Sequence, residues 1–550
     1  MKFRFITIIS IFIIVYSFLI FKLYQIQISD NQNYRARAES QYAASGLFKA
    51  LRGKIFFTDK KNKTLAVVLN RDFPVIYAVP KEIEDYKETA HQLTPILDIS
   101  VEELEKKLSK SDNLYQLLIK KAPAELIIRV NNLKIKGIYT TFETDRLYPF
   151  NSLMSHVLGF TASSEDSEGE VGQYGLERFY EKTLSGQEGN GEDGKITEGK
   201  AGKDLILTID SNIQKEAQKI LDSLITKQEA KGGTIIVQEP QTGKILAMES
   251  QPSFNPNEYG KFTLESFLNP SVQAIYEPGS VFKVITMAAG IDSGKITPET
   301  AFNDTGILKV SGREIKNWDL KAHGRVTMTN VLEKSINTGA AFAEKATGHS
   351  IFRNYLEKFG FSEKTGADLP GELGGNLNRL KERAPEVAFA TASFGQGVAI
   401  TPLELINAFS AIANGGRLLR PYLNSELGSK EIRRVISEKS AKEVTTMMVS
   451  ALDKAEIGQI KSYALAGKTG TAQIPDFENG GYTDKVINTY IGFGPTNNSK
   501  FVILIKLDDP KGAPLAGTTV VPAFRELAQF ILTYYNLPPD RLESSVNNDL

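Results

Sequence analysis

The chain has no cysteine and few histidines, and these absences limit the chemistry open to it. Its 550 residues include four histidines: His91, His156, His323 and His349. Without cysteine there can be no disulfide, no catalytic thiolate and no cysteine-based zinc or iron–sulfur site. The histidines are scattered and not at metal-ligand spacing, so we interpret each as structural. A nucleophilic serine in this chain is therefore expected to use an amine as its base rather than an imidazole.

The chain also lacks an excess of charge of either sign. Its 65 basic and 65 acidic residues give a formal net charge of zero. This balance argues against a nucleic-acid partner held by phosphate contacts. The apolar fraction of 41% and the charged fraction of 24% are typical of folded proteins, which excludes global disorder. The length allows two to four domains with at least one large core.

One long apolar run lies near the N-terminus. Residues 5–21 carry no charge and follow Lys2 and Arg4. At roughly 1.5 Å per residue, the run is just long enough to cross a bilayer with little tilt. A cleaved signal peptide is the alternative, but its apolar region is usually shorter, and the small-residue pattern at 36–38 lies too far downstream. We predict an uncleaved anchor within residues 1–24, whose flanking charges do not settle its orientation.

A polar, glycine-rich stretch beginning at residue 186 predicts a boundary between two domains. The preceding part, residues 25–203, mixes strand-like and helical segments without a recognisable chemical site, and its last part, about 186–203, forms the linker. Residues 204–538 begin with a strand at 205–209 and a hairpin around 240–243. They continue with a mostly helical region at about 325–460 and end with strands at 490–493 and 501–505 and a helix at about 523–534. This order predicts an α+β domain, an antiparallel sheet built from both ends with helices between, and a disordered tail at 539–550.

Ser280 and Lys283 form the only serine–lysine pair in the chain at this three-residue spacing. Pro278 and Gly279 end the preceding segment, and an apolar stretch that can form a helix follows. We therefore expect Ser280 near a helix N-terminus, where backbone N–H groups favour negative charge. Three residues make almost one helical turn, so the Lys283 amine can reach the Ser280 hydroxyl. These are the parts of an activated acyl-transfer nucleophile, although an isolated pattern of this kind is more often an unrelated surface pair.

Two further short patterns follow in the chain. Ser335 and Asn337 form an S-x-N pattern, which is common in this sequence and means little alone. Lys468 begins K-T-G, and a second K-T-G begins at Lys364 in a loop-like context. The residues after Lys468 can form an edge strand, where Gly470 would let a substrate backbone approach closely. A second lysine near Lys283 would also help to keep one of the two amines neutral.

The order S-x-x-K, S-x-N, K-T-G resembles that of the penicillin-recognising acyltransferases, which are penicillin-binding proteins and serine β-lactamases. Further segments are similar to those of class B penicillin-binding proteins: 52–55, 146–149, 156–160 and 174–177 in the pedestal, and 207–210, 395–397, 401–403 and 413–416 in the transpeptidase domain. The resemblance runs from the anchor to about residue 538. Two departures are the turn Asp59–Lys63 and Glu404, where glutamine is commoner.

This resemblance implies a peptidoglycan D,D-transpeptidase with a penicillin-binding protein fold and a pedestal of the dimerisation type. Ser280 would form an acyl-enzyme with release of D-alanine, and Lys283 would take its proton. Ser335 and Lys468 would relay a proton to the leaving amine, and Asn337 would bind the substrate backbone. No metal or organic cofactor is implied. The other assigned positions are Thr469, Gly470 and Thr471 for substrate binding and the backbone N–H groups of Ser280 and Thr471 for the oxyanion hole.

The resemblance also implies a location and partners. The implied location is the bacterial cytoplasmic membrane, with the N-terminus in the cytoplasm and the catalytic domain outside. Stem peptides would be substrates, β-lactams would acylate the enzyme, and a polytopic glycosyltransferase and divisome proteins would be partners. The lead-in Tyr276–Gly279 and the compact pedestal favour septal wall synthesis. The alternatives are an elongation-type transpeptidase and a catalytically silent scaffold of the wall-synthesis complex.

Overall fold

The computed structural model describes residues 2–29, 50–110, 115–163, 170–189, 197–476, 478–512 and 515–541. The chain forms two compact units and passes between them more than once. The first consists of residues 1–54, 68–147 and 182–204, and the second of 55–67, 148–181 and 205–550. Two segments that precede residue 204 thus pack with the C-terminal unit. Most of the predicted tail and part of the glycine-rich stretch lie outside the described residues.

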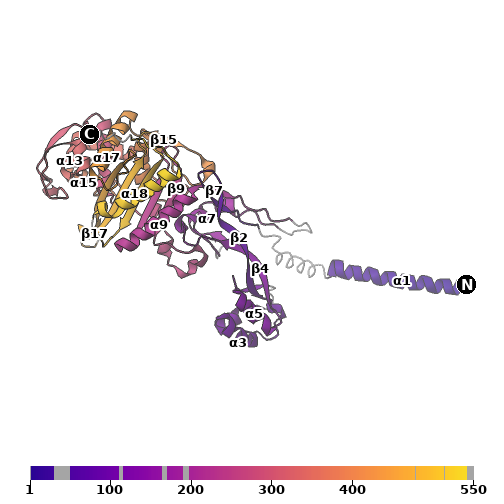
Figure 1. Cartoon of the computed structure of the whole chain (residues 1–550). Coiled ribbons are helices and arrows are strands. Elements are labelled where there is room, and N and C mark those ends of the chain that lie inside the picture. Colours follow the sequence, from indigo (N-terminus) through magenta and orange to yellow (C-terminus); the bar gives the residue numbers. More distant parts are fainter. Residues whose placement is uncertain are drawn as a thin grey trace, which may run out of the picture. The chain divides into compact units, whose positions relative to one another are not determined.

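The N-terminal apolar run forms a helix, as predicted. Helix α1 spans Lys2–Tyr24 and continues into a π-helical turn at Gln25–Ser29 (Figure 1). The stretch Phe3–Ser29 is long and apolar enough to cross a membrane, with a mean hydropathy of 2.5 in its most apolar window and no buried side chain there. Exposed apolar side chains all round a helix are typical of a segment surrounded by lipid. The helix is consistent with a single-pass anchor.

The first unit is built around strand β2. β2 (Leu65–Ala78) pairs antiparallel with β4 (Ile138–Leu147) and with β3 (Gln116–Ile119). Its core takes side chains from three helices: α3 (Tyr86–Leu97), α4 (Val101–Leu108) and α5 (Ala124–Leu133). The charged segment at 102–107 is helical. It is amphipathic rather than fully exposed, because Leu104 and Leu108 are buried.

The second unit contains a five-stranded antiparallel sheet, as predicted. The strand order is β16–β17–β18–β8–β9. The strands β8 and β9 form the predicted hairpin, and the C-terminal strand β18 pairs with β8, so both ends of the domain meet in one sheet. β16 lies at the edge, and within the described part of the chain it pairs only with β17. The strand bounds are β8 (Gly232–Gln238), β9 (Ile245–Gln251), β16 (Ala466–Pro475), β17 (Tyr482–Gly494) and β18 (Phe501–Asp508).

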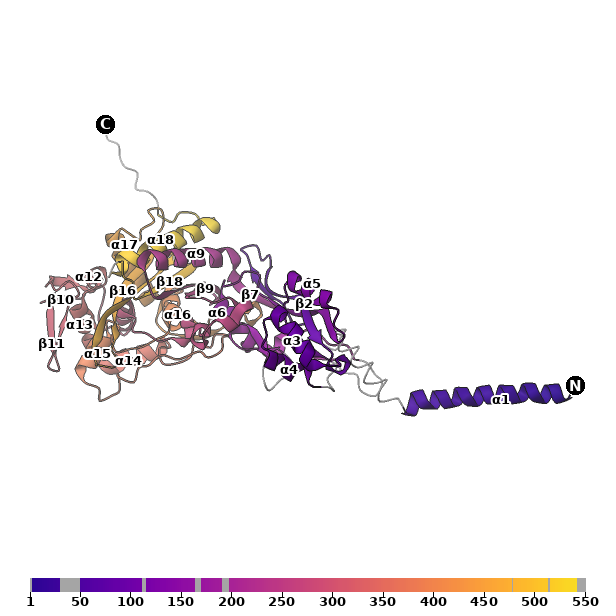
Figure 2. The same ribbon diagram turned by 90° about the horizontal axis from the view of Figure 1, so that it is seen from below.

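Helices cover both faces of this sheet. α9 (Ser211–Gln228) and α18 (Ala516–Tyr534) lie side by side on one face, where they bury a large apolar cluster (Figure 2). Asp210 caps α9 by accepting hydrogen bonds from two backbone N–H groups. α16 (Pro402–Ala413) packs on the opposite face. The expected start of α18 at about 523 is wrong, because the helix begins at Ala516 with Pro522 inside it. A proline removes one helical hydrogen bond, which the burial of its neighbours Val520, Val521 and Phe524 offsets.

The remaining helices and strands connect these layers. Six helices are the main regular elements of the region 325–460, which also holds one short hairpin. In chain order the elements are β1 (Ile55–Thr58), α6 (Ser155–Leu158), β5 (Thr161–Ser163), β6 (Glu170–Gly172), α7 (Gly175–Phe179), α8 (Glu181–Leu184), β7 (Leu205–Asp210), α10 (Pro270–Gln273), α11 (Lys283–Asp292), β10 (Ala301–Asp304), β11 (Ile307–Val310), β12 (Arg313–Lys316), β13 (Gly324–Thr327), α12 (Met328–Glu333), α13 (Asn337–Thr347), α14 (His349–Lys358), α15 (Glu386–Ala392), β14 (Arg417–Leu419), β15 (Glu431–Arg434) and α17 (Glu438–Ala455).

Both departures from the family pattern make specific contacts. In the turn after β1, Asp59 accepts hydrogen bonds from the backbone of Lys61 and Lys63, and the Lys60 amine donates to the carbonyl of Tyr534 at the end of α18. A cation is favourable at that end of a helix. Glu404 forms a capping box with Thr401 at the start of α16.

Glu249 is a buried carboxyl on β9 with incomplete hydrogen bonding. One of its oxygens accepts hydrogen bonds from the Met154 backbone at 3.0 Å and from the Gln214 side chain at 2.6 Å. Its other oxygen has no partner among the described residues. Burial raises the pKa of Glu249 to about 8. The carboxyl is thus protonated in the folded chain over a pH range in which an unfolded chain would release that proton.

We expect Glu249→Gln to stabilise the protein increasingly as pH rises from about 4.5 to 8. In this window the folded wild type keeps a proton that the unfolded chain loses, so its free energy of unfolding falls with pH, whereas the variant has no such group. The difference in Tm between variant and wild type should grow by on the order of 2 °C or more across the window. Thermal unfolding at several pH values measures it. Glu299→Gln, at an exposed position, should show no such trend, and an equal Tm difference at all pH values for Glu249→Gln would contradict the prediction.

Candidate active site

Ser280 lies at the turn that opens α11, as predicted. A 3₁₀ turn at Gly279–Phe282 leads directly into the helix, and Lys283 is its first residue. Gly279 has a φ of 63°, a conformation that favours glycine. Ser280 is half-buried, whereas the Lys283 side chain is completely buried. The Lys283 Nζ lies 3.1 Å from the Ser280 Oγ.

The residues of the S-x-N pattern contact the Lys283 amine from the turn between two other helices, α12 and α13. Ser335 lies between α12 and α13 with a φ of 56°, and Asn337 is the first residue of α13. The Ser335 Oγ lies 3.1 Å from the Lys283 Nζ, and the Ser335 carbonyl lies 2.6 Å from it. The Asn337 Oδ1 accepts from the same amine at 2.8 Å. The tight turn therefore places a hydroxyl, a carbonyl and an amide oxygen around one buried amine.

Lys468 approaches from the edge strand β16. Its Nζ lies 3.1 Å from the Ser335 Oγ, so this hydroxyl stands between two amines. Its side chain is 4% exposed. The second K-T-G pattern is not part of the site, because Thr365 and Gly366 hydrogen-bond to the buried carboxylate of Glu372. The context that distinguished the two lysines in the sequence thus selected the one that reaches Ser335.

Burial dominates the electrostatics of both lysines. It lowers the pKa of Lys283 well below its ordinary value, and the charge of Lys468 lowers it further. Burial also lowers the pKa of Lys468 to about 7. A neutral Lys283 amine has two protons and one lone pair. The two N–H groups of this amine can donate hydrogen bonds to the Ser335 carbonyl and the Asn337 amide oxygen. The lone pair is then available to the Ser280 hydroxyl.

The residues after Lys468 pack against the Ser280 turn. A Cβ at Gly470 would lie 2.8 Å from the Pro278 carbonyl oxygen and 3.0 Å from a Val281 methyl group. Contact with this turn is thus one reason for a glycine at position 470, and the substrate approach expected from the sequence stays a prediction. Thr469 and Thr471 are half-buried, and the Thr471 Oγ1 accepts a hydrogen bond from the Ala516 backbone at 3.1 Å.

Sequence reasoning missed the polar residues that support the S-x-N turn. Asn317 accepts hydrogen bonds from the backbone of Asn337 and Thr338, and Asp304 bonds to both Asn317 and Thr338. No spacing rule relates these positions, because they belong to a separate segment that forms two small sheets, β10 with β13 and β11 with β12. Among the described residues, no group of three or more histidine, aspartate or glutamate side chains is placed to hold a metal ion.

We expect Gly470→Ala to destabilise the second unit. The new methyl group would meet backbone atoms of the Ser280 turn, which cannot move as freely as a side-chain end. Overpacking of this kind costs about 1–3 kcal/mol, so Tm should fall by several degrees in a thermal unfolding experiment. Gly517→Ala is the matched control, because a Cβ at that helical glycine meets nothing within 4 Å. Equal Tm values for the two variants would contradict this explanation of Gly470.

The chain matches two described families over most of its length. Residues 233–529 match the penicillin binding protein transpeptidase domain, and residues 48–211 match the penicillin-binding protein dimerisation domain. The chain is 31% identical over 547 residues to the stage V sporulation protein D of Bacillus subtilis, covering 93% of this chain and 83% of that protein. It is 28% identical over 516 residues to the peptidoglycan D,D-transpeptidase FtsI of Escherichia coli, covering 90% and 85%.

The fold agrees with a solved relative. The crystal structure of penicillin binding protein 2X from Streptococcus thermophilus superposes with a TM-score of 0.70 at 23% identity, covering 89% of this chain and 81% of that one. The two matching domains, the extent of the sequence similarity and this fold lead to one conclusion. The chain belongs to the class B penicillin-binding proteins and is a peptidoglycan D,D-transpeptidase of the serine type.

Proposed function

We propose that Ser280 is the nucleophile of this transpeptidase and Lys283 its base. The observation that carries the proposal is the Lys283 amine, which is fully buried, has a lowered pKa and lies 3.1 Å from the Ser280 Oγ. An amine can take a hydroxyl proton only when it is itself neutral, and burial supplies that condition. The Ser335 carbonyl and the Asn337 amide oxygen accept hydrogen bonds from this amine and so orient its lone pair towards Ser280.

In the first step the Ser280 Oγ attacks the carbonyl carbon between the two terminal D-alanines of a stem peptide. The Oγ–C bond forms as the hydroxyl proton passes to Lys283. The C–N bond then breaks, and a proton reaches the leaving amine through the Ser335 hydroxyl from Lys468. D-Alanine leaves, and an ester remains on Ser280. The position of Ser335, 3.1 Å from each amine, supports this relay.

In the second step an amine of a neighbouring stem peptide attacks the ester. The new amide bond forms as one proton of this amine passes through the Ser335 hydroxyl to Lys468, which is neutral after the first step. The C–Oγ bond breaks as the Ser280 Oγ takes its proton back from Lys283, and the cross-link is complete. Asn337 would bind the substrate backbone, and the groups proposed for the substrate carboxylate are the Thr469 and Thr471 hydroxyls. The backbone N–H groups of Ser280 and Thr471 would stabilise the oxyanion. In support, a Cβ built on Gly279 would lie 3.2 Å from the Thr471 carbonyl, so the two backbones adjoin.

We further propose that the cross-linking serves septal wall synthesis. Support comes from relatives that are named FtsI and stage V sporulation protein D and that align with nearly the whole chain, although the identities are modest. The enzyme would be held in the cytoplasmic membrane by α1, with its N-terminus in the cytoplasm and the catalytic domain outside. A polytopic glycosyltransferase and divisome proteins would be its partners, and β-lactams would acylate Ser280 as substrate mimics.

Benzylpenicillin should form one covalent adduct with the full-length protein in detergent, and Ser280→Ala should form none. The ester is expected to persist, because a transpeptidase has no dedicated base to hydrolyse it. Intact mass spectrometry after incubation with the drug detects the adduct. Rapid turnover of the drug without a lasting adduct would indicate a β-lactamase. Absence of both adduct and turnover would favour the silent scaffold.

The rate of acylation should fall at alkaline pH with an apparent pKa near 7. Lys468, whose pKa is lowered to about 7, must hold a proton to protonate the leaving group, and it loses this proton as pH rises. Lys468→Ala should be slower by about 100-fold or more and should lack this alkaline limb. Stopped-flow or mass-resolved kinetics with benzylpenicillin between pH 5 and 9 tests this. An alkaline limb that persists unchanged in Lys468→Ala would refute the role of Lys468.

A further inference from the structure

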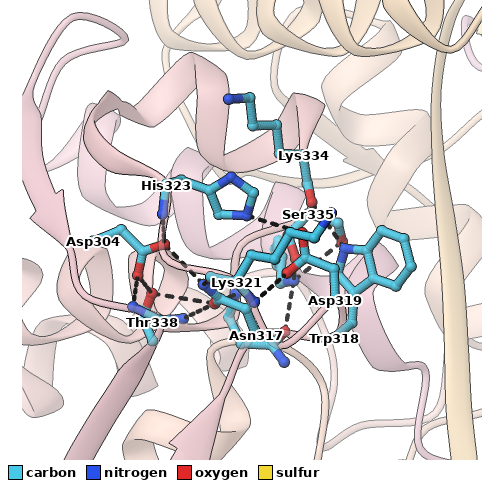
Figure 3. Close-up of polar contacts among 12 residues, drawn as sticks. Asp304, Asn317, Trp318, Asp319, Lys321, His323, Lys334, Ser335 and Thr338 are labelled. Carbon is cyan, nitrogen blue, oxygen red and sulfur yellow. Dashed lines mark hydrogen bonds and ion pairs between the residues drawn. The ribbon is translucent and has the colours of Figure 1, made fainter.

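Two small two-stranded sheets between α11 and α12 carry a buried polar network that ends at the S-x-N turn (Figure 3). β10 pairs with β13, and β11 pairs with β12. Asp304 ends β10, and Asn317 follows β12. The side chains of both point towards Thr338 in the first turn of α13. None of these three residues touches the Ser280 or Lys283 side chain in the contacts described above, so their part in the site is indirect.

Asp304 is the fixed point of this network. Its carboxylate is 2% exposed and accepts four hydrogen bonds: from the Gly306 and His323 backbones at 2.9 Å each, from Asn317 Nδ2 at 2.8 Å and from Thr338 Oγ1 at 2.6 Å. Burial acts to raise the pKa of Asp304, but these hydrogen bonds outweigh it and the pKa lies below its ordinary value. The group is therefore an ionised carboxylate whose acceptor positions are filled by four donors.

Asn317 links this carboxylate to α13. Its Nδ2 donates to Asp304 and to the Lys321 carbonyl at 3.0 Å, so its Oδ1 must face the other way. That oxygen accepts from the backbone N–H groups of Asn337 at 3.1 Å and Thr338 at 3.2 Å. These two N–H groups lie in the first turn of α13, where the helix itself offers them no carbonyl acceptor. The cap residue Ile336 has no side chain that could do so.

The residue before Asn317 fixes the side chain of Asn337. The Asn337 Nδ2 donates to the Lys316 carbonyl at 2.8 Å, which turns its Oδ1 towards the Lys283 amine. Residues 316 and 317 thus hold both the backbone and the amide orientation of Asn337. Without this contact the Asn337 amide is free to rotate and to present its NH₂ group to Lys283. The Lys283 amine would then lose the acceptor for one of its N–H groups and face a donor instead.

We propose that Asn317, oriented by Asp304 and Thr338, is a positioning residue for acylation, acting through Asn337 on Lys283. The inference rests on the proposed function of Ser280 and Lys283. A buried ionised group is weak evidence for a purely stabilising role, because apolar packing of similar volume often stabilises a fold as well or better. What the network provides is a single orientation of the S-x-N turn, and small displacements of catalytic groups reduce rates strongly.

The test compares acylation by benzylpenicillin in full-length wild type and three variants. Asn317→Ala removes the acceptor, and Thr338→Val removes the hydroxyl while keeping the shape. Thr338→Ser keeps the hydroxyl and serves as the conservative rescue. We expect the first two to acylate about tenfold more slowly, because each breaks a hydrogen bond in a network held by a charged group. Thr338→Ser should stay within about twofold of wild type.

Asn407→Ala is the control for general destabilisation, because Asn407 is equally buried and accepts a hydrogen bond from Gln238 away from the site. It should acylate like wild type at a temperature at which all variants are folded. The single tryptophan, Trp318, supplies a local probe, since its Nε1 donates to the Lys334 carbonyl beside Ser335. Because Trp318 is already 59% exposed, the readout is its emission spectrum, which should shift in Asn317→Ala and not in Asn407→Ala.

The outcomes separate this inference from the proposed function. If wild type forms no Ser280 adduct, the proposed function fails. If wild type acylates and Asn317→Ala or Thr338→Val is equally fast, the positioning role is overturned. It is also overturned if Thr338→Ser is as slow as Thr338→Val, or if Asn407→Ala slows acylation as much as Asn317→Ala does.

Discussion

The burial of the Lys283 amine is the constraint on which the rest of the catalytic unit depends. A charged ammonium in that position would be strongly disfavoured, and an amine without hydrogen-bond acceptors would also be costly. Both costs are avoided in this site. The pKa of Lys283 is lowered, and its neutral amine donates hydrogen bonds to the Ser335 carbonyl and the Asn337 amide oxygen. Each element that touches this amine therefore has a narrowly defined place.

Three separate parts of the chain meet there, and each uses local backbone chemistry to do so. Gly279 allows the tight turn before Ser280, Ser335 adopts a left-handed conformation between two helices, and Gly470 lets an edge strand pack on the serine turn. The edge position of β16 matters, because a strand with a free side can offer backbone groups to an extended peptide. The sheet behind it, covered on both faces by helices, keeps this edge in place.

Buried carboxyl groups in this unit fall into two classes. Asp304 accepts four hydrogen bonds and has a lowered pKa, whereas Glu249 has one oxygen without a partner among the described residues and a raised pKa. Both side chains are almost fully inaccessible to solvent, and Asp304 accepts four hydrogen bonds where Glu249 accepts two. A carboxylate surrounded by donors makes a rigid anchor, and Asp304, at the end of β10, hydrogen-bonds to Thr338 beside the S-x-N turn.

The sequence by itself determined the α+β class, the hairpin of β8 and β9, the apolar N-terminal helix and the three short patterns, because periodicity, turn residues and fixed spacing are local properties. It also separated Lys468 from Lys364 by the residues that follow each. Only the tertiary structure decided that Asp304 and Asn317 support Asn337, that α18 starts at Ala516, and that residues 55–67 and 148–181 pack with the C-terminal unit. These features arise from contacts between residues distant in the chain and from the burial that offsets an interior proline, and no local pattern encodes either.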